Sequence, residues 1–177
     1  SCVLLGSPAK NTCPRECALY VSCYGNHMPF ARRMRHGPQI ERALWFELGK
    51  LQKRYPRGFV LRLHILGDFY SAGYVSLWAE ALSAFPALRV FGYTARSPES
   101  RIGGAVAALR DSQWDRFAVR TSGAADGPRT LVIENEESCP EGAIVCPAQT
   151  GKTRSCSICG LCWAEAAKDR PVAFIRH

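Results

Sequence analysis

Four cysteines in the C-terminal part of the chain have the spacing of a metal site. Cys146 is followed by Cys156, Cys159 and Cys162, and the last three form two consecutive C-x2-C steps that share Cys159. Soft thiolate ligands select zinc, copper(I) or iron–sulfur clusters, and a C-x2-C step lets two sulfurs reach one metal from a tight turn. We therefore interpret these cysteines as a four-thiolate ligand set. Disulfides or small core residues are the alternative, although sulfurs two residues apart pair poorly.

A second group of cysteines lies near the start of the chain. Cys13, Cys17 and Cys23 form a C-x3-C-x5-C triple. Three thiolates can hold a [4Fe–4S] cluster by three of its irons and leave the fourth iron open to a substrate or cosubstrate. Alternatively, Cys2 is a fourth ligand and closes the site as a structural one. A third reading joins all seven cysteines, with His177, around one larger site.

Length and composition limit the class of protein. The chain has 177 residues, of which 47% are hydrophobic and 21% charged, as in an ordinary globular domain. It has no apolar run long enough to span a membrane and no signal-peptide pattern, although it begins with Ser1 and a short N-terminal piece could be missing. Nine cysteines is an odd number, and clustered thiols in a reducing compartment more often hold metals than form disulfides. These features favour a cytoplasmic protein.

The net charge of +8 is unevenly distributed along the chain. Residues 1–57 carry ten Lys and Arg against three Asp and Glu, and the remaining residues carry thirteen against twelve. The basic residues that define this end are Arg32, Arg33, Arg35, Lys53, Arg54 and Arg57. Nucleic acid is one anionic partner that such a segment could contact. A solvated helix face, or arginines around an anionic cluster or substrate, are the alternatives.

The elements that must position these residues alternate between strands and helices. Residues 1–30 form an N-terminal cysteine loop, residues 39–133 a β/α core, and residues 134–177 a cysteine-rich region with a last strand; together they make a single domain. We expect four helices: at 39–55, from Ser71 as N-cap to Phe85, from Ser97 (N-cap, with Pro98 at N1) through Leu109, and at about 161–168. The expected strands are at 59–66, 88–93, 117–120, 130–133 and 171–175. Residues 134–159 read as a long loop. This alternation predicts an α/β fold with a mostly parallel sheet, and the chain length fits a partial, open β/α barrel.

Functional groups of parallel α/β folds collect at the carboxyl ends of the strands. That rule selects one set of residues, and both cysteine loops should gather beside it. The set consists of His64, Gly67, Asp68, Tyr93, Thr94, Arg96, Arg120, Thr121, Ser122 and His177. Each has a structural alternative: Asp68 could cap the next helix, His64 could be a hydrogen-bonded core residue, and Tyr93 could serve in packing alone.

The ordered set of motifs resembles the phage and plasmid "gene product 88-like" proteins. The resemblance runs from about residue 12 to the end. It is carried by Thr12-Cys13-Pro14 with Cys17 and Cys23-Tyr24-Gly25, Leu61-Arg62-Leu63-His64 with Gly67-Asp68-Phe69, Tyr93-Thr94, Cys146-Pro147-Ala148-Gln149-Thr150-Gly151-Lys152 with Cys156, Cys159 and Cys162-Trp163, and Phe174 to His177. That family looks in turn like a shortened relative of radical SAM enzymes, with a C-x3-C-x5-C loop in place of C-x3-C-x2-C and an Asp in place of the usual Glu.

The resemblance implies a function for each group of residues. Cys13, Cys17 and Cys23 would bind an open [4Fe–4S] cluster, and Gly67 and Asp68, with Thr94 beside them, would contact S-adenosylmethionine. Cys146, Cys156, Cys159 and Cys162 would hold a second, auxiliary cluster or a zinc ion. The expected activity is one-electron chemistry on a phage- or plasmid-related substrate. The alternative is a non-catalytic module, stabilised by its metals, that binds nucleic acid through the basic N-terminal third.

Overall fold

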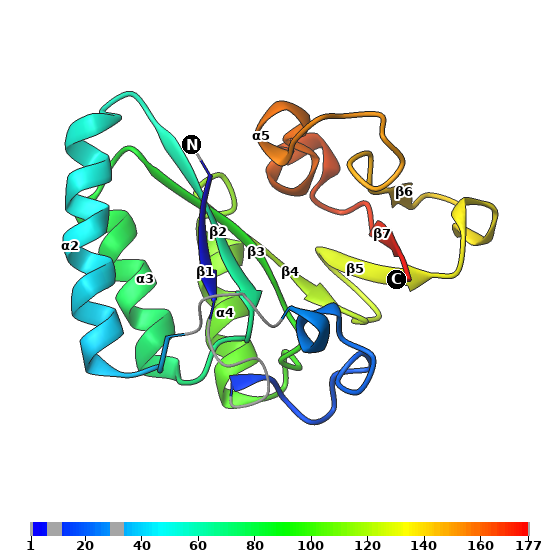
Figure 1. Cartoon of the computed structure of the whole chain (residues 1–177), viewed down its shortest axis with the longest axis horizontal. Helices are drawn as coiled ribbons and strands as arrows, with labels where there is room; N and C mark the ends of the chain where they lie inside the picture. Colours follow the sequence, from blue (N-terminus) through cyan, green and yellow to red (C-terminus); the bar gives the residue numbers. More distant parts are fainter. Residues whose placement is uncertain (1, 7–11, 29–33, 177) are drawn as a thin grey trace.

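One sheet organises the molecule. The computed structural model describes residues 2–6, 12–28 and 34–176, and its seven strands have the order β1-β2-β3-β4-β5-β7-β6 (Figure 1). Every neighbouring pair of strands is parallel. Because β1 and β6 are the two edges and do not pair with each other, the sheet is not closed. The predicted α/β class, with an open and parallel sheet, is confirmed.

The elements follow the expected alternation. The strands are β1 (Cys2–Gly6), β2 (Phe59–Leu66), β3 (Leu88–Thr94), β4 (Phe117–Ser122), β5 (Arg129–Ile133), β6 (Ile144–Val145) and β7 (Val172–Ile175). The α-helices are α2 (Pro38–Arg54), α3 (Ala72–Ala84), α4 (Arg101–Ser112) and the single turn α5 (Cys156–Cys159). The 3-10 turns are η1 (Tyr24–His27), η2 (Glu136–Ser138), η3 (Leu161–Trp163) and η4 (Glu165–Ala167).

Helices α2, α3 and α4 pack against the same face of the sheet. Strands β1 to β4 lie in sequence order, so right-handed crossovers carry all three connecting helices to one side. Leu61 and Leu63 of β2, Val90 of β3 and Trp78 of α3 are buried in the core between these two layers. The largest apolar core of the described chain is therefore on this face.

The opposite face of the sheet is covered by the C-terminal segment instead of helices. Phe91 of β3 and Ala118 of β4 form a second core cluster with Cys146, Cys162 and Val172. Strand residues alternate between the two faces, so the residues of β3 on either side of Phe91 pack toward the helices. The cysteine-rich segment therefore lies against the sheet, and it forms the right-hand part of the molecule in Figure 1.

Two strands were missed by the sequence prediction. Residues 2–6 were assigned to the N-terminal loop, yet they form β1, which pairs with β2. Residues 144–145 were assigned to a long loop, yet they form β6 at the other edge. Both runs are very short and apolar, and they are too short to show a period-2 pattern. Pairing with a neighbouring strand decides their conformation.

Two helix predictions also need correction. Helix α4 begins at Arg101 with Ser100 as its N-cap, whose hydroxyl accepts from the Gly103 N–H (3.0 Å), instead of starting at Ser97. The Ser97 carbonyl occupies the space beside Gly103, where a Cβ would lie only 1.9 Å from it, so residues 97–100 form a turn that packs onto the helix. The helix expected at 161–168 is two separate 3-10 turns, η3 and η4.

The described residues contain no helix that is long and apolar enough to cross a bilayer.

Two candidate cysteine centres

Thr12 ties the N-terminal cysteine loop to the carboxyl ends of β2 and β3. Its hydroxyl accepts a hydrogen bond from the Asp68 backbone N–H (3.0 Å), and its carbonyl accepts one from the Arg96 guanidinium (2.6 Å). The same guanidinium donates to the Phe69 carbonyl (3.0 Å). Thr12 is buried, and Cys13 follows it directly in the chain. The first cysteine of the triple is thereby fixed at this edge of the sheet.

Asp68 joins the ends of the same two strands. Its buried carboxylate accepts hydrogen bonds from the Phe69 N–H (2.7 Å), the Thr94 hydroxyl (2.7 Å) and the Ala95 N–H (2.8 Å). Burial raises the pKa of this carboxyl, and the three hydrogen bonds oppose the rise. Gly67 precedes it with φ 88°, a conformation that favours glycine. The predicted cosubstrate residues Gly67, Asp68 and Thr94 are thus brought together, and Asp68 has a structural role among them.

The N-terminal thiols affect one another's titration, and Asp68 acts on two of them. Burial, followed by the negative charge of Asp68 and then by Cys17 and Cys23, raises the pKa of Cys13 to about 12. Burial also raises the pKa of Cys17, and Cys23 and Asp68 add to the rise. All three cysteines are partly exposed. A cation among them would reverse this effect, because a metal ion deprotonates the thiols that coordinate it.

The C-terminal thiols form a second and more deeply buried group. Cys146 and Cys162 are buried, and Cys156 packs against the same cluster. Burial raises the pKa of Cys162 to about 11, and the nearby Cys146 and Cys156 add to the rise. The Tyr93 hydroxyl lies 2.9 Å from the Cys162 sulfur. Cys159 ends α5, one turn after Cys156, and is partly exposed.

The loop after Cys146 is hydrogen-bonded to the last strand, β7. The Cys146 N–H donates to the Ala173 carbonyl (2.8 Å), which continues the ladder of β6 and β7. The Gln149 side chain then takes the place of a strand residue: its amide donates to the Ile175 carbonyl (3.0 Å) and accepts from the Ile175 N–H (2.9 Å). The motif around Cys146 and Gln149 therefore has a clear structural function, which is to hold the first thiol of this group in place.

Arg120 is fully buried next to the C-terminal thiols, and the described residues provide no carboxylate that pairs with it. Its guanidinium donates to the carbonyls of Cys162 (3.1 Å), Ala167 (2.7 Å), Lys168 (3.2 Å) and Arg170 (3.0 Å). Its positive charge lowers the pKa of Cys162. A second guanidinium, that of Arg62, lies over the Tyr93 ring (5.7 Å to the centroid). A buried charge requires a partner, so these cations suit an anionic group at the thiols.

The cysteine sulfurs are suitable ligands for a metal or cluster, but their positions in the structure do not form a complete ligand set. Within the described part of the chain, no three His, Cys, Asp or Glu side chains are grouped as a metal site. The donor type is nevertheless right, because no cysteine of the two groups is in a disulfide and soft sulfur selects zinc or iron–sulfur clusters. A centre with four thiolate ligands carries net negative charge, which Arg120 would offset.

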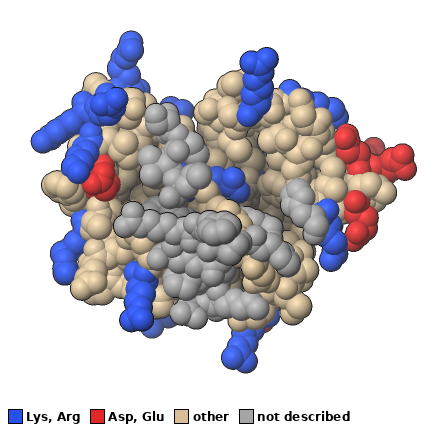
Figure 2. Space-filling view, viewed as in Figure 1, with Lys and Arg blue, Asp and Glu red and all other residues tan. Residues whose placement is uncertain are grey.

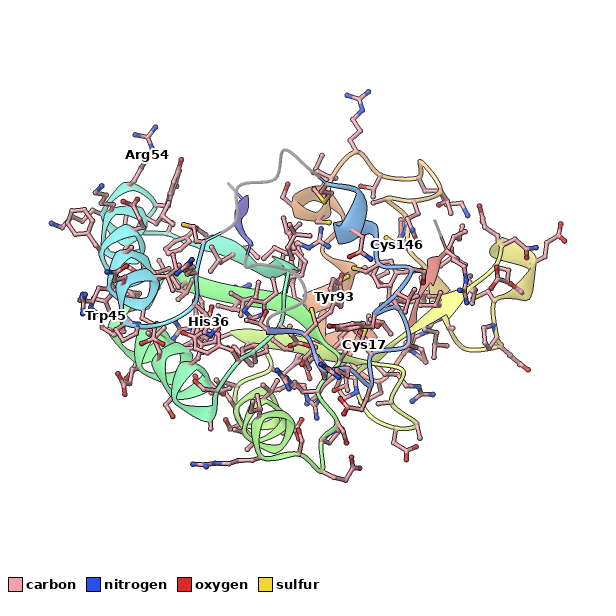
Figure 3. All side chains as sticks on the ribbon, turned by 60° about the horizontal axis from the view of Figure 1, so that its bottom comes forward. Cys17, His36, Trp45, Arg54, Tyr93 and Cys146 are labelled. Atoms are coloured by element: carbon pink, nitrogen blue, oxygen red, sulfur yellow. The ribbon has the colours of Figure 1, made fainter. Side chains whose placement is uncertain are left out.

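The end of β3 connects the two groups of thiols. Thr94 donates to Asp68, which acts electrostatically on Cys13, while the preceding residue, Tyr93, contacts Cys162. Successive side chains of a strand point to opposite faces. Tyr93 therefore reaches the C-terminal thiols, while Thr94 reaches Asp68 beside the N-terminal thiols. In Figure 3, Cys17, Tyr93 and Cys146 lie on the same side of the molecule, away from Trp45 on α2.

His64 is not part of either group of thiols. It has φ 53° within β2, next to the irregular pairing with β1. This bulge turns its ring toward the helical face, where Nε2 lies 3.3 Å from the Tyr74 hydroxyl and the ring packs edge-on against Phe69. Burial lowers the pKa of His64 to about 3, and its buried Nδ1 has no hydrogen-bond partner among the described residues. The structure therefore places it as a core histidine.

The remaining strand-end residues make structural contacts. The Thr121 hydroxyl accepts from Arg110 (3.3 Å), and the Ser122 hydroxyl accepts from Thr130 (3.2 Å). Asp68 does not cap α3, because Ser71 performs that function by accepting from the Tyr74 N–H (3.0 Å). His177 lies outside the described residues.

The basic end of the chain is exposed where it is described. Arg35, Lys53, Arg54 and Arg57 are exposed, the last three at or just after the end of α2, whereas Arg32 and Arg33 lie outside the described residues. Figure 2 shows Lys and Arg around the edge of one face, with most of the visible Asp and Glu gathered at one end.

Sequence reasoning missed Thr12 and Gln149 as positioning residues. Thr12 precedes Cys13 directly, and Gln149 follows Cys146 by three residues, so each could have been suspected from its place beside a predicted ligand. Their roles depend on contacts with Asp68 and Ile175, which are remote in the chain. Comparison with protein-family models, with curated proteins and with solved structures gave no match for this chain.

Proposed function

We propose that this chain is an iron–sulfur protein of radical SAM-like type, built on a partial, open β/α barrel. Cys13, Cys17 and Cys23 would bind an open [4Fe–4S] cluster. Cys146, Cys156, Cys159 and Cys162 would hold an auxiliary cluster or a zinc ion. The fold supports the barrel part of the proposal in one respect: β1 to β4 run in sequence order with α2, α3 and α4 on one face, the arrangement found in β/α barrels.

One observation carries the proposal. A loop with three partly exposed thiols is held by Thr12 at the carboxyl edge of the sheet, and its first thiol, Cys13, lies close enough to Asp68, Cys17 and Cys23 for their charges to raise its pKa. Functional groups of parallel α/β folds collect at this edge. Partly exposed thiols can present a bound group to a substrate, whereas the buried Cys146 and Cys162 cannot.

The residues around the N-terminal thiols would each have a separate task. When bound, an open [4Fe–4S] cluster supplies one electron to a cosubstrate at its free iron. Arg96 fixes the loop through the Thr12 carbonyl, and Thr94 orients the Asp68 carboxylate. Among the described residues, the second Asp68 oxygen, Oδ2, accepts from the Ala95 N–H alone. That oxygen would accept from the amino group of S-adenosylmethionine.

Anaerobic purification with iron and sulfide analysis tests this proposal. We expect a coloured protein with iron and acid-labile sulfide, and an EPR signal after reduction that changes when S-adenosylmethionine is added. A colourless protein that holds stoichiometric zinc and no iron would end the proposal. A reduced cluster whose EPR signal ignores S-adenosylmethionine would retain the iron–sulfur part and remove the radical SAM part.

A further inference from the structure

A pocket of about 410 Å³ lies between the sheet and the C-terminal segment. Its sheet wall includes Val60, Arg89 and Phe91, its other wall includes Ser157 and Trp163, and Arg57 also lines it. This volume is within the range of small-molecule sites. The lining contains the start of β2 and of β3, so the pocket lies at the amino ends of these strands. It is therefore at the opposite end of the sheet from Thr12 and Asp68.

The direction of Arg89 follows from strand alternation. Leu88 and Val90 are buried in the core on the helical side, so Arg89 and Phe91 are on the face that the C-terminal segment covers. Phe91 packs against the Trp163 ring, with 4.5 Å between the ring centroids. Arg89 extends from the same wall but remains exposed. A guanidinium and an indole thus line one pocket from its two sides.

Neither pocket arginine has an acidic partner among the residues that the structure describes. In the described ranges, neither Arg57 nor Arg89 forms an ion pair, and no Asp or Glu lines the pocket. Two unpaired guanidiniums beside a hydroxyl favour an anion, and arginine suits phosphate oxygens in particular because its N–H groups form a planar fork. An indole beside them offers a surface on which a planar base can stack.

We propose that this pocket binds a nucleotide unit, with its phosphate at Arg57 and Arg89 and its base against Trp163. The unit is either a free nucleotide or part of a single strand, since both present the same chemistry. The proposal does not depend on iron or zinc at the cysteines. It gives the basic end of the chain a definite place of contact, because Arg57 lies three residues after the end of α2.

Equilibrium binding distinguishes the two sources. The full chain, purified with its metals, is titrated into AMP by calorimetry and into a fluorescein-labelled ten-nucleotide oligothymidylate by anisotropy, both at low salt. Binding of AMP indicates a site for a free nucleotide, and binding of the oligonucleotide alone indicates a site for a strand. The expected strand affinity falls steeply with salt. Binding of neither probe overturns the proposal.

The variant Arg57→Ala/Arg89→Ala tests the phosphate contact. Both residues are exposed, so we expect the chain to fold and its affinity for the bound probe to fall at least tenfold. The matched control is Arg42→Ala/Arg101→Ala, which removes the same charge from exposed positions on α2 and α4. An equal loss in both variants would show a general effect of charge and contradict a site at this pocket.

Trp163→Leu tests the base contact. Loss of one stacked base corresponds to a fall in affinity of about 5- to 150-fold. Trp45→Leu, at a half-exposed tryptophan on α2, should leave the affinity unchanged. Circular dichroism and metal content are measured for both, since Trp163 follows Cys162. A folded, metal-loaded Trp163→Leu protein with unchanged affinity would contradict the assigned place of the base.

Discussion

The two cysteine regions differ in how the fold holds them. The N-terminal thiols are partly exposed and belong to a loop that is fixed by side-chain hydrogen bonds around Thr12 and Asp68. The C-terminal thiols lie in an apolar cluster against the sheet, beside a strand ladder and the buried Arg120. A site built into a core contributes to folding, and an exposed site leaves room for a ligand. We therefore expect substitutions in the two regions to separate stability from metal binding and activity.

Removal of Arg120 should have the largest effect on stability. Arg120→Met leaves the buried carbonyls of Cys162 and Ala167 and the partly buried carbonyls of Lys168 and Arg170 without this donor, and unsatisfied buried groups are costly. We expect the free energy of unfolding, measured by urea titration, to fall by about 3–5 kcal/mol.

A second arginine that binds carbonyls is the matched control. Arg116 donates to the Phe85 and Leu88 carbonyls on the helical side, and it is only partly buried. Arg116→Met should therefore cost less, about 1–2 kcal/mol. An equal loss of stability in the two variants would contradict the claim that the buried Arg120 contributes more to stability, through the carbonyls of the C-terminal segment, than the partly buried Arg116 does.

Asp68 is the corresponding test of the N-terminal region. Asp68→Ala removes three hydrogen bonds, two of which join the end of β2 to the end of β3, and we expect the free energy of unfolding to fall by about 2–3 kcal/mol in thermal or urea unfolding. Metal bound at the C-terminal thiols should remain, because Asp68 raises the pKa of Cys13 and Cys17, which belong to the N-terminal group. Loss of all metal from a folded Asp68→Ala protein would favour one shared site.

His64 should make stability depend on pH. Its pKa in the folded chain is about 3, below the ordinary value of 6.5, so the unfolded chain binds the extra proton first. The stability contributed by the neutral ring is complete above pH 6.5 and is lost as the pH falls toward 3, at up to about 1.4 kcal/mol per pH unit.

The variant His64→Asn removes this titration, and asparagine tolerates the positive φ. The free energy of unfolding is measured at several pH values between roughly pH 6 and pH 4. Its slope against pH should be smaller for this variant by about 1 kcal/mol per pH unit. His36→Asn, at an exposed histidine, should retain the slope of the unsubstituted chain. A His64→Asn protein with an unaltered slope would show that the ring is already protonated in the fold.

Tyr93 should produce the smallest change in stability and a measurable change in the bound group. Tyr93→Phe removes the hydroxyl that lies 2.9 Å from the Cys162 sulfur, and it should cost about 0.5–1.5 kcal/mol. If the C-terminal centre is a cluster, loss of a hydrogen bond to its sulfur should lower its reduction potential. Tyr74→Phe, on the helical side, should leave the potential unchanged, and equal potentials in all three proteins would contradict a contact with the centre.

The sequence was sufficient for the parts of the fold that depend on local pattern. The buried strand 59–66 was predicted with its observed bounds, and Ser71 was predicted as the N-cap of α3, because these signals lie within a few residues. The edge strands β1 and β6 were missed because their pairing partners are far away in the chain. For the same reason, the sequence indicated that Asp68 and Thr94 would meet at one edge but not that Thr12 would join them.

The most direct test compares iron content after substitution of each group of cysteines. The combined variant Cys13→Ser, Cys17→Ser and Cys23→Ser is reconstituted anaerobically beside the unsubstituted chain and beside Cys146→Ser, Cys156→Ser and Cys162→Ser. We predict that the N-terminal variant loses about four irons per chain, remains folded and keeps the metal of the C-terminal region, and that the C-terminal variant loses stability as well. Unchanged iron in the N-terminal variant, or zinc without iron in the unsubstituted chain, would contradict an open cluster at Cys13, Cys17 and Cys23.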